Sequence, residues 1–385
     1  MDIDTQFSTP HGQYRLRRLP LQHHPSLRAW DAADDYLIQA ITDASTGSGQ
    51  TLVLNDDFGA LSIGLLPQQP VIWFDSAVEA GALAMNLSAN ELPPLTMISQ
   101  TELPPTEPVS RVVLKIPRNS ALLDWQLAMI NRHLPAGTPV LLGGMLKHVT
   151  PADQKVMATR LQDLTHSRIV RKARYWQGVT RHEDAIPQPE HWSVPEVEFS
   201  LVNRAGVFSA RRPDPGAVCL LQHFSDIAGA ELPEQAQVLD LCCGNGILGL
   251  AWQQRFRTHS VYFSDASAAA IDSVHANWQR YCQDSGANSR DSAPILHQDG
   301  LRDTPDLRFN LILCNPPFHQ ADTVTTDVSR ELFRQARYAL QPQGQLIVVA
   351  NRHLGYHRLL RADFQKVAVL SGDKRFVVMA ASQPN

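Results

Sequence analysis

Short apolar runs alternate with amphipathic segments through the second half of the chain. The amphipathic segments, residues 266–281 and 327–340, carry apolar residues near the 3.6-residue period of a helix. The apolar runs are rich in Val, Ile, Leu and Phe and cover residues 236–243, 260–265, 309–314 and 344–350. Strands that alternate with helices predict an α/β fold with a parallel, doubly wound sheet.

Residues 366–382 break this alternation. Two strand-like runs flank the stretch Ser371 to Lys374, a connection too short for a helical crossover and typical of a hairpin. An antiparallel last strand on a parallel sheet resembles the class I methyltransferase architecture and differs from ordinary dinucleotide-binding folds. The resemblance implies a Rossmann-like domain of the methyltransferase type.

The first half of the chain repeats the same order of strands and helices. Its glycine-containing turn can be aligned by pairing Gly59 with Gly244, and residues 112–118 take the place of residues 311–318. It lacks both the glycine pattern and the Asn-Pro-Pro sequence of the second half. These features predict two tandem domains of one fold, of which the N-terminal one is degenerate. A chance likeness between two α/β domains is the alternative.

Three prolines, Pro187, Pro189 and Pro195, mark a stretch with little periodic apolar pattern between the halves. Proline interrupts helices and sheet ladders, so such a stretch is typical of a connection. We therefore predict a degenerate domain over residues 1–185, a linker over 186–196 and a second domain over 197–385.

Composition narrows the class of protein. The 385 residues are 43% hydrophobic and 19% charged, as in a globular protein, and the formal net charge of −4 does not indicate a nucleic-acid binder. Any basic face must be local, and the best candidate is the run with Arg168, Arg171, Lys172 and Arg174, which a solvated surface explains equally well.

Cysteine usage and the absence of long apolar segments bear on location. The five cysteines are odd in number and show no metal-ligand spacing, which favours reduced thiols in the cytosol. The N-terminal stretch has no apolar core of a secretory signal, and no window reaches about 18 apolar residues. We expect a cytoplasmic protein, monomeric, with no metal site and no membrane contact.

A glycine-rich turn follows the first strand of the second half. Gly244, Gly246 and Gly249 are spaced as in a loop that brings backbone N–H groups close to a ligand, and Asn245 lies between the first two. Asp265, at the end of the next strand, is placed to accept hydrogen bonds from ribose hydroxyls. These residues fit NAD and S-adenosylmethionine equally, and glycines that only turn a corner are a third reading.

Asn315-Pro316-Pro317-Phe318 follows the run at 309–314, at the sheet edge where open α/β folds bind ligands. The Asn315 carboxamide oxygen and the Pro316 carbonyl can each accept one N–H of an exocyclic amine and turn its lone pair toward a methyl donor. The prolines hold both acceptors rigid, and Phe318 can stack on an unstacked base. The alternative is a plain strand stop.

Several sequences resemble known families. Asn315 to Phe318 resembles the loop of amino methyltransferases that act on adenine N6, guanine N2 or a glutamine amide. The sequence "DLCCGNG", residues 240–246, resembles the acidic, glycine-rich loop of class I methyltransferases, with Cys242 where the family has glycine. That likeness implies that Asp240 meets the amino group of S-adenosylmethionine and that Asp299 contacts its adenine, unless Asp299 is only a solvated loop residue.

The stretch 205–224 with its "GVFS" sequence, and the residues after Pro317, resemble the corresponding stretches of the bacterial ribosomal RNA guanine-N2 methyltransferases. Together with the degenerate first half, the resemblance extends over nearly the whole chain. The resemblance implies that Phe208 lines the cofactor or target pocket, with core packing as the alternative. It implies a positional role for His319 beside the base, with a general base as the alternative, and a supporting or RNA-binding role for the N-terminal domain through Arg171, Lys172 and Arg174.

The resemblance implies methylation of a guanine N2 amine in 23S ribosomal RNA, with S-adenosylmethionine as cofactor and ribosomal RNA as partner. A small-subunit ribosomal RNA guanine is the nearest alternative, followed by adenine N6 and a protein glutamine. An NAD-dependent oxidoreductase and a non-catalytic RNA-binding protein are the alternatives from other classes.

Overall fold

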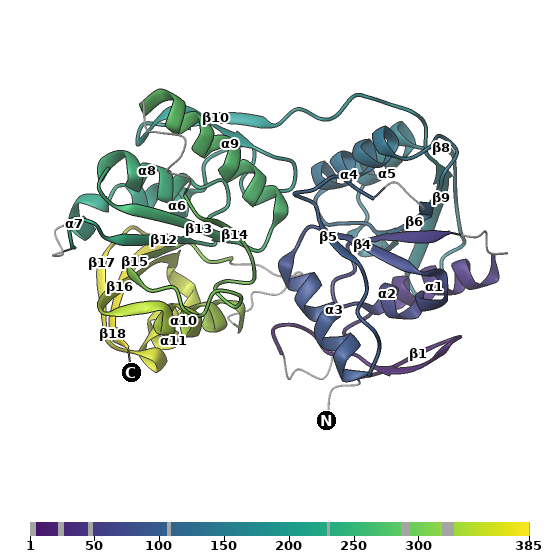
Figure 1. Ribbon diagram of the computed structural model, residues 1–385, viewed down its shortest axis with the longest axis horizontal. Helices are drawn as coiled ribbons and strands as arrows, with labels where there is room; N and C mark the ends of the chain where they lie inside the picture. The colour runs from purple at the N-terminus through teal and green to yellow at the C-terminus, as the bar shows by residue number, and fades with distance from the viewer. Residues whose placement is uncertain are drawn as a thin grey trace. The chain divides into compact units, whose positions relative to one another are not determined.

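The computed structural model describes residues 5–21, 27–44, 49–105, 109–228, 232–285, 293–317 and 327–384 (Figure 1). The chain divides into two compact units, Met1–Gln188 and Pro189–Asn385. Part of the predicted linker, Glu190–Val194, forms strand β10, which pairs antiparallel with β11 (Val197–Asn203). Trp192 and Val194 pack against the core of the C-terminal unit, so this strand belongs to that unit. In the described part of the chain, no helix is long and apolar enough to cross a membrane.

The C-terminal unit contains a seven-stranded sheet in the order β14-β13-β12-β15-β16-β18-β17. The strands are β12 (Gln237–Leu241), β13 (Ser260–Asp265), β14 (Ile295–His297), β15 (Phe309–Cys314), β16 (Leu340–Asn351), β17 (Phe364–Gly372) and β18 (Phe376–Pro384). Strands β12 to β16 are parallel, and β18 runs antiparallel to both β16 and β17. The predicted hairpin and antiparallel last strand are confirmed.

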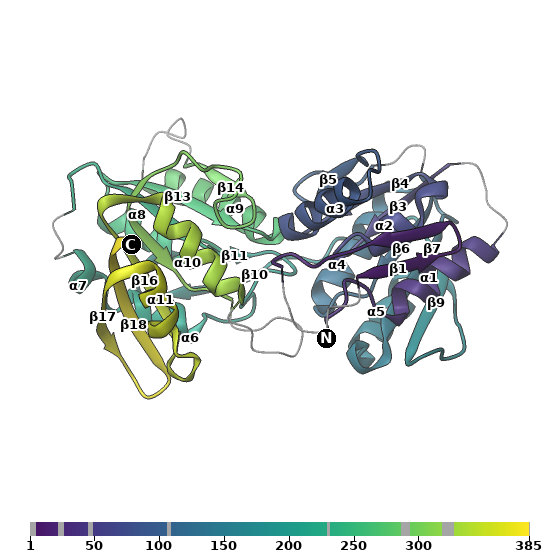
Figure 2. The same ribbon diagram turned by 90° about the horizontal axis from the view of Figure 1, so that it is seen from below.

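Helices cover both faces of this sheet (Figures 1 and 2). One face carries α6 (Pro215–Leu221), α7 (Phe224–Ala228), α8 (Ile247–Arg255) and α9 (Ala268–Ser285). The other carries α10 (Asp327–Ala339) and α11 (Tyr356–Asp363), and the short helix η3 (Arg352–Leu354) follows β16. Because both faces are covered, the parallel strands are mostly apolar and read as nearly continuous apolar runs, with Asp240 on β12 as a buried exception.

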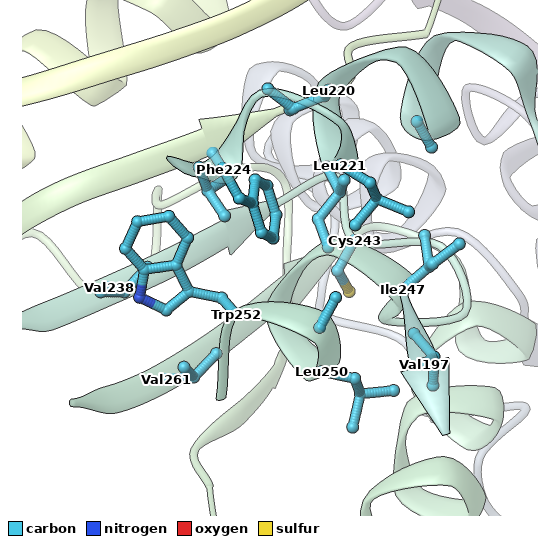
Figure 3. Packing of buried hydrophobic residues seen from close by; sticks show 14 of the residues in the cluster. Val197, Leu220, Leu221, Phe224, Val238, Cys243, Ile247, Leu250, Trp252 and Val261 are labelled. Atoms are coloured by element: carbon cyan, nitrogen blue, oxygen red, sulfur yellow. The ribbon is translucent and has the colours of Figure 1, made fainter. Parts of the chain in front are cut away.

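The core beneath α8 positions the glycine turn (Figure 3). Trp252 of α8 is fully buried and meets the ring of Phe224 edge-on, with the centroids 5.1 Å apart. Gly249 has no side chain, and a Cβ there would come within 2.4 Å of the Phe263 ring on β13. Glycine at this position therefore lets α8 lie close against the sheet and holds the start of the helix over its carboxyl edge.

The N-terminal unit contains a second seven-stranded sheet, in the matching order β5-β4-β3-β6-β7-β9-β8. Its strands are β3 (Gln50–Leu54), β4 (Pro70–Phe74), β5 (Met97–Ser99), β6 (Val109–Lys115), β7 (Pro139–Met145), β8 (Gln162–His166) and β9 (Ala173–Val179). The hairpin β1 (Gln6–Thr9) and β2 (Gly12–Arg15) precedes it, as β10 and β11 precede the other sheet. The predicted repetition of one fold is confirmed.

The helices of the N-terminal unit also cover both faces of its sheet. One face carries α1 (Ala32–Asp43), α2 (Ala60–Gly64) and α3 (Ala77–Ala89), and the other carries α4 (Ser120–His133) and α5 (Pro151–Arg160). Short 3₁₀ turns occupy η1 (Leu66–Gln68) and η2 (Leu146–His148).

Equivalent hydrogen bonds occur inside each of the two units. On α3, the Asn86 amide accepts from the backbone N–H of Arg17 and donates to the carbonyls of Arg17 and Phe58. On α9, the Asn277 amide makes the same three bonds with Val202 and Asn245. An asparagine on the helix thus ties the preceding hairpin to the loop after the first strand of the sheet in both units.

The pairing of Gly59 with Gly244 is wrong by two residues. Gly59, with φ of 87°, directly precedes α2 in the way that Gly246, with φ of 83°, precedes α8. Asn55 and Cys242 also match, with φ of 57° and 60° directly after their strands. The left-handed backbone at each place, rather than the spacing of glycines, determines which residues correspond.

Candidate active site

The glycine turn of the C-terminal unit is tied down by Asp265. One carboxylate oxygen of Asp265 accepts from the backbone N–H of Gly244 at 2.9 Å, and the other accepts from that of Ser267 at 2.9 Å. Burial raises the pKa of Asp265, although these two N–H groups oppose the rise. Asp265, the predicted ribose-binding residue, thus also joins the glycine turn to the start of α9. Both of its carboxylate oxygens have further lone pairs for other donors.

Asn245 holds the other side of the turn. Its side-chain amide donates to Asn203 Oδ1 at 2.8 Å, and its oxygen accepts from the backbone N–H of Ile247 at 3.2 Å. Asn245 is 5% exposed, so its side chain is committed to this buried network. Asn203 and Asn277, which complete the network, were not singled out by the sequence.

Asp240 is completely buried on β12. Its Oδ2 accepts from the backbone N–H of Gly249 at 2.8 Å, while Oδ1 has no hydrogen-bond partner among the described residues. Burial raises the pKa of Asp240 to about 8. An unsatisfied buried carboxyl oxygen is rare in folded proteins, and a cationic ligand would satisfy it.

Asp299 follows β14 and already has a partner. Arg302 donates to one of its oxygens from two nitrogens, at 3.1 and 2.9 Å. Burial nevertheless raises the pKa of Asp299, with Arg302 opposing the rise. An adenine amino group would have to share the carboxylate with Arg302.

Asn315 directly follows β15 at the carboxyl edge of the sheet. Its Nδ2 donates to Asp214 Oδ2 at 3.0 Å, and its buried Oδ1 has no hydrogen-bond partner in the described ranges. Asp214 is the N-cap of α6, where the same oxygen accepts from the N–H of Ala217 at 2.9 Å. The carboxylate therefore orients the amide, leaving the acceptor oxygen of Asn315 for another donor. Asp-Pro at a helix start signals the cap, but the sequence did not reveal this contact.

Gly216 gives the acceptor room. A Cβ at this position would lie 2.9 Å from Asp214 Oδ2, 3.3 Å from the Phe376 ring and 3.4 Å from Asn315 Oδ1. These three side chains, from α6, β15 and β18, therefore converge on one point at the carboxyl edge. Phe318 and His319, which were predicted to contact the base, lie outside the described residues.

Phe208 is 62% exposed, and the neighbouring Val207 is the buried residue, packed against Ala269 and Ala270 of α9. The core-packing alternative for Phe208 is therefore wrong, because Val207 occupies that place.

Most of the basic run of the N-terminal unit lies on the turn between β8 and β9, and its last residue, Arg174, lies on β9. Arg171 and Lys172 take left-handed backbone conformations there and are exposed. Arg171 is ion-paired with Asp35 at 2.7 Å, and Arg174 lies 5.9 Å from the ring of Trp176. The run is therefore a hairpin turn with a partly neutralised charge.

The N-terminal counterpart of the Asn315 position is Lys115. The strand registers align them, since Thr51 pairs with Arg111 as Val238 pairs with Leu311. Lys115 Nζ lies 2.9 Å from Asp34 and 3.3 Å from Asp31, which caps α1 as Asp214 caps α6.

This substitution changes the chemistry of the position. Burial lowers the pKa of Lys115, but Asp34 and Asp31 outweigh that effect and the net shift is upward. An ammonium has no acceptor for an amine N–H. The N-terminal unit thus has a buried ion pair where the C-terminal unit has an acceptor.

Comparison with known proteins identifies the family. The RLMG N-terminal domain model matches residues 4–182, and the methyltransferase small domain model matches residues 198–380. A protein of Shewanella loihica called ribosomal RNA large subunit methyltransferase G is 33% identical over 98% of this chain and 95% of its own length. A protein of the same name from Alcanivorax borkumensis is 34% identical over 99% of this chain and 97% of its own.

The chain belongs to the ribosomal RNA large subunit methyltransferase G family. The predicted family and S-adenosylmethionine as cofactor are thereby confirmed, and the oxidoreductase alternative is wrong.

A solved structure agrees with the fold. The T. thermophilus 16S rRNA N2 methyltransferase RsmC, in complex with AdoMet and guanosine, superposes with a TM-score of 0.76 at 23% identity, covering 98% of this chain and 97% of its own. Among the described residues, no group of three or more His, Cys, Asp and Glu side chains could hold a metal ion.

Proposed function

We propose that the C-terminal unit methylates the exocyclic N2 amine of a guanine in large-subunit (23S) ribosomal RNA. The observation that carries the proposal is the buried Oδ1 of Asn315, an acceptor without a partner in the described residues, whose amide is oriented by Asp214. The similarity to the ribosomal RNA large subunit methyltransferases G of Shewanella loihica and Alcanivorax borkumensis supports the large subunit, and the complex of RsmC with guanosine supports the base.

Asn315 and Pro316 act on the amine. A lone pair conjugated with the base is a poor nucleophile, and two acceptors that each take one N–H favour a more tetrahedral nitrogen with its lone pair free. Pro317 and the hydrogen bond to Asp214 limit the rotation of the two acceptors, so little conformational entropy remains to be lost when the reaction occurs. When bound, S-adenosylmethionine supplies a methyl group on a positively charged sulfur. The nitrogen lone pair forms the new bond to carbon, the old carbon–sulfur pair remains on sulfur, and the amine proton passes to water.

Cofactor contacts are assigned to the residues of the turn. The unsatisfied Oδ1 of Asp240 would take the ammonium group, and Asp265 would use its remaining lone pairs for ribose hydroxyls. The backbone at Gly244 and Gly246 would approach the ligand, while Asn245 supports the turn from behind. Asp299 would share its carboxylate between Arg302 and the adenine amine.

The base contacts and the N-terminal role complete the proposal. Phe318 would stack on the base and His319 would position it, while Phe208, exposed before α6, would line the same pocket. The N-terminal unit would support RNA binding through the turn that carries Arg171, Lys172 and Arg174.

The deciding experiment incubates the protein with S-adenosylmethionine carrying a radioactive methyl group and with ribosomal RNA, either protein-free or in subunits. We expect N2-methylguanosine in the large-subunit RNA after digestion to nucleosides. Recovery of N6-methyladenosine, or label only in small-subunit RNA, would contradict the assigned base or subunit.

Asn315→Ala tests the mechanism. Removing one preorganised hydrogen-bonding group costs on the order of 10²-fold in rate, and the same loss is expected here. S-adenosylhomocysteine affinity should be retained, because the hydrogen bond that the Asn315 side chain makes to a described residue goes to Asp214 and not to the glycine turn. Methyl transfer at the parent rate would refute the two-acceptor mechanism.

A further inference from the structure

A basic cavity lies where β16 and the β17–β18 hairpin end. Its volume is about 530 Å³, and it is lined by Asn351, Arg352, His353, Lys374 and Arg375. Arg352, Lys374 and Arg375 are all exposed, and among the described residues none of them forms an ion pair with a carboxylate. We call these five residues the hairpin pocket.

Arg352 is fixed in place without losing its charge. Its Nε and Nη2 donate to the backbone carbonyl of Asp373 at 3.0 and 2.8 Å. Gly372 makes room for this, because a Cβ there would lie 2.9 Å from Nη2 of Arg352. A guanidinium held by a neutral carbonyl keeps its full positive charge for a ligand.

The carboxylate of Asp373, in the turn between β17 and β18, already accepts hydrogen bonds from the backbone of that turn. Asp373 Oδ1 accepts from the N–H groups of Arg375 and Phe376, both at 2.6 Å. These bonds, first that from Phe376, lower the pKa of Asp373, with Arg375 and Arg352 nearby adding to the effect. The carboxylate shapes the turn, and three permanent cations face one anion there.

The hairpin pocket is next to the candidate active site. Asn351 of the pocket pairs with Phe376 across β16 and β18. The Phe376 ring in turn lies 3.3 Å from the point above Gly216 that is 3.4 Å from Asn315 Oδ1. A single buried ring therefore separates the acceptor for the amine from the cationic surface.

We propose that the hairpin pocket binds backbone phosphates of the RNA beside the nucleotide that is methylated. The inference rests on the proposed function and names the part of the substrate that this edge of the unit takes. A base presented to Asn315 must leave its stack, so its flanking phosphates need to be held where they enter and leave the site. Phosphates are the anions that arginine and lysine hold at RNA and DNA surfaces, and they set position rather than sequence preference.

The test compares two double substitutions of equal charge. Lys374→Gln with Arg375→Gln removes two cations from the hairpin pocket. Arg257→Gln with Arg308→Gln removes two exposed arginines at the opposite, amino-terminal edge of the same sheet, before β13 and β15. Binding of the substrate RNA is measured over a salt series in the presence of S-adenosylhomocysteine.

Each lost phosphate contact lowers the slope of log affinity against log salt by about 0.7–0.9, so the hairpin variant should lose about 1.5. At about 0.1 M salt, the same slope corresponds to an RNA affinity about sixfold weaker for each lost contact, or about 30-fold weaker for the pair. The matched control should keep the parent slope.

A charge-conserving variant separates charge from packing, because Arg375 also lies 5.5 Å from the Phe376 ring. Lys374→Arg with Arg375→Lys should keep the parent slope. An unchanged slope in the Gln variant, or an equal loss in the control, would overturn the proposal. An acidic protein partner for this pocket would give that unchanged slope. The binding measurement is independent of the modified base, so an error in the proposed function is recognised separately, from the nucleoside product.

Discussion

Asp214 is expected to set the methylation rate through Asn315 without touching the substrate. Its Oδ2 accepts both from Asn315 Nδ2 at 3.0 Å and from the N–H of Ala217 at 2.9 Å. Serine is as good an N-cap as aspartate, but its hydroxyl is one bond shorter and would not reach Asn315. Asp214→Ser therefore removes the amide contact and keeps the cap.

The size of the effect follows from that one hydrogen bond. A bond to a charged group contributes about 1.5–3 kcal/mol, which at about 1.4 kcal/mol per factor of ten amounts to about 10- to 100-fold in rate. Without it, the Asn315 amide can turn and present Nδ2, a donor, to the amine. Asp214→Asn keeps an oxygen acceptor but loses the charge, so its loss should be about 3- to 10-fold.

The assay is single-turnover methyl transfer at saturating RNA and cofactor, with S-adenosylhomocysteine titration and urea unfolding of the same samples. The rate should fall in the order Asp, Asn, Ser, while the free energy of unfolding falls by no more than about 3 kcal/mol, the contribution of the lost bond, because the cap exchange itself changes it by less than about 0.5 kcal/mol. Asn119→Ser, a matched cap exchange on α4, should change neither quantity by more than that. A parent rate for Asp214→Ser would refute the positioning role. A rate loss that disappears once the rate is divided by the fraction of folded protein would show that Asp214 acts only through stability.

Two further predictions concern buried charge. Burial raises the pKa of Asp240 to about 8, so the folded protein holds a proton that the unfolded chain releases near pH 4, and stability should fall as the pH rises through this window. Urea unfolding of the ligand-free protein between about pH 5 and 8 should show a decline to which Asp34 also contributes, and Asp240→Asn should remove at most about 4 kcal/mol of it; equal pH profiles for the two proteins would contradict the burial argument. Lys115→Ala leaves Asp34, whose pKa burial raises to about 7, without its cation, and should cost about 3 kcal/mol of stability near pH 8. The cost should shrink near pH 5, where Asp34 is protonated; a loss independent of pH would show that the ion pair is not its source.

Much of the fold could be predicted because it depends on local patterns. Short apolar runs specify strands and 3.6-residue periodicity specifies helices, and their alternation specifies a parallel sheet with covered faces. The short connection at Ser371–Lys374 admits only a hairpin, and the structure has β17 and β18 there. The position of Asn315 at the carboxyl edge follows from the same logic, because the chain must leave β15 at that edge.

Other features could not be predicted, since they depend on which surfaces meet. Asn315 and Asp214 are 101 positions apart, and only the packing of α6 beside β15 makes them partners. The joining of the hairpin turn to the end of β16, through Arg352 and the carbonyl of Asp373, arises in the same way. The pairing of Gly59 with Gly244 failed because it rested on residue identity alone. The left-handed backbone before each helix decides which positions correspond, and it pairs Gly59 with Gly246.

The sequence by itself determined the order and type of the elements, the doubling of the fold, and the residue types at the sheet edge, because these follow from side-chain chemistry and local backbone preference. Only the tertiary structure decided that the Oδ1 of Asn315 remains for a donor while its Nδ2 is held by Asp214, that Asp240 is buried with a raised pKa, and that Lys115 forms a buried ion pair with Asp34. The reason is that charge, burial and orientation depend on neighbours that are distant in sequence.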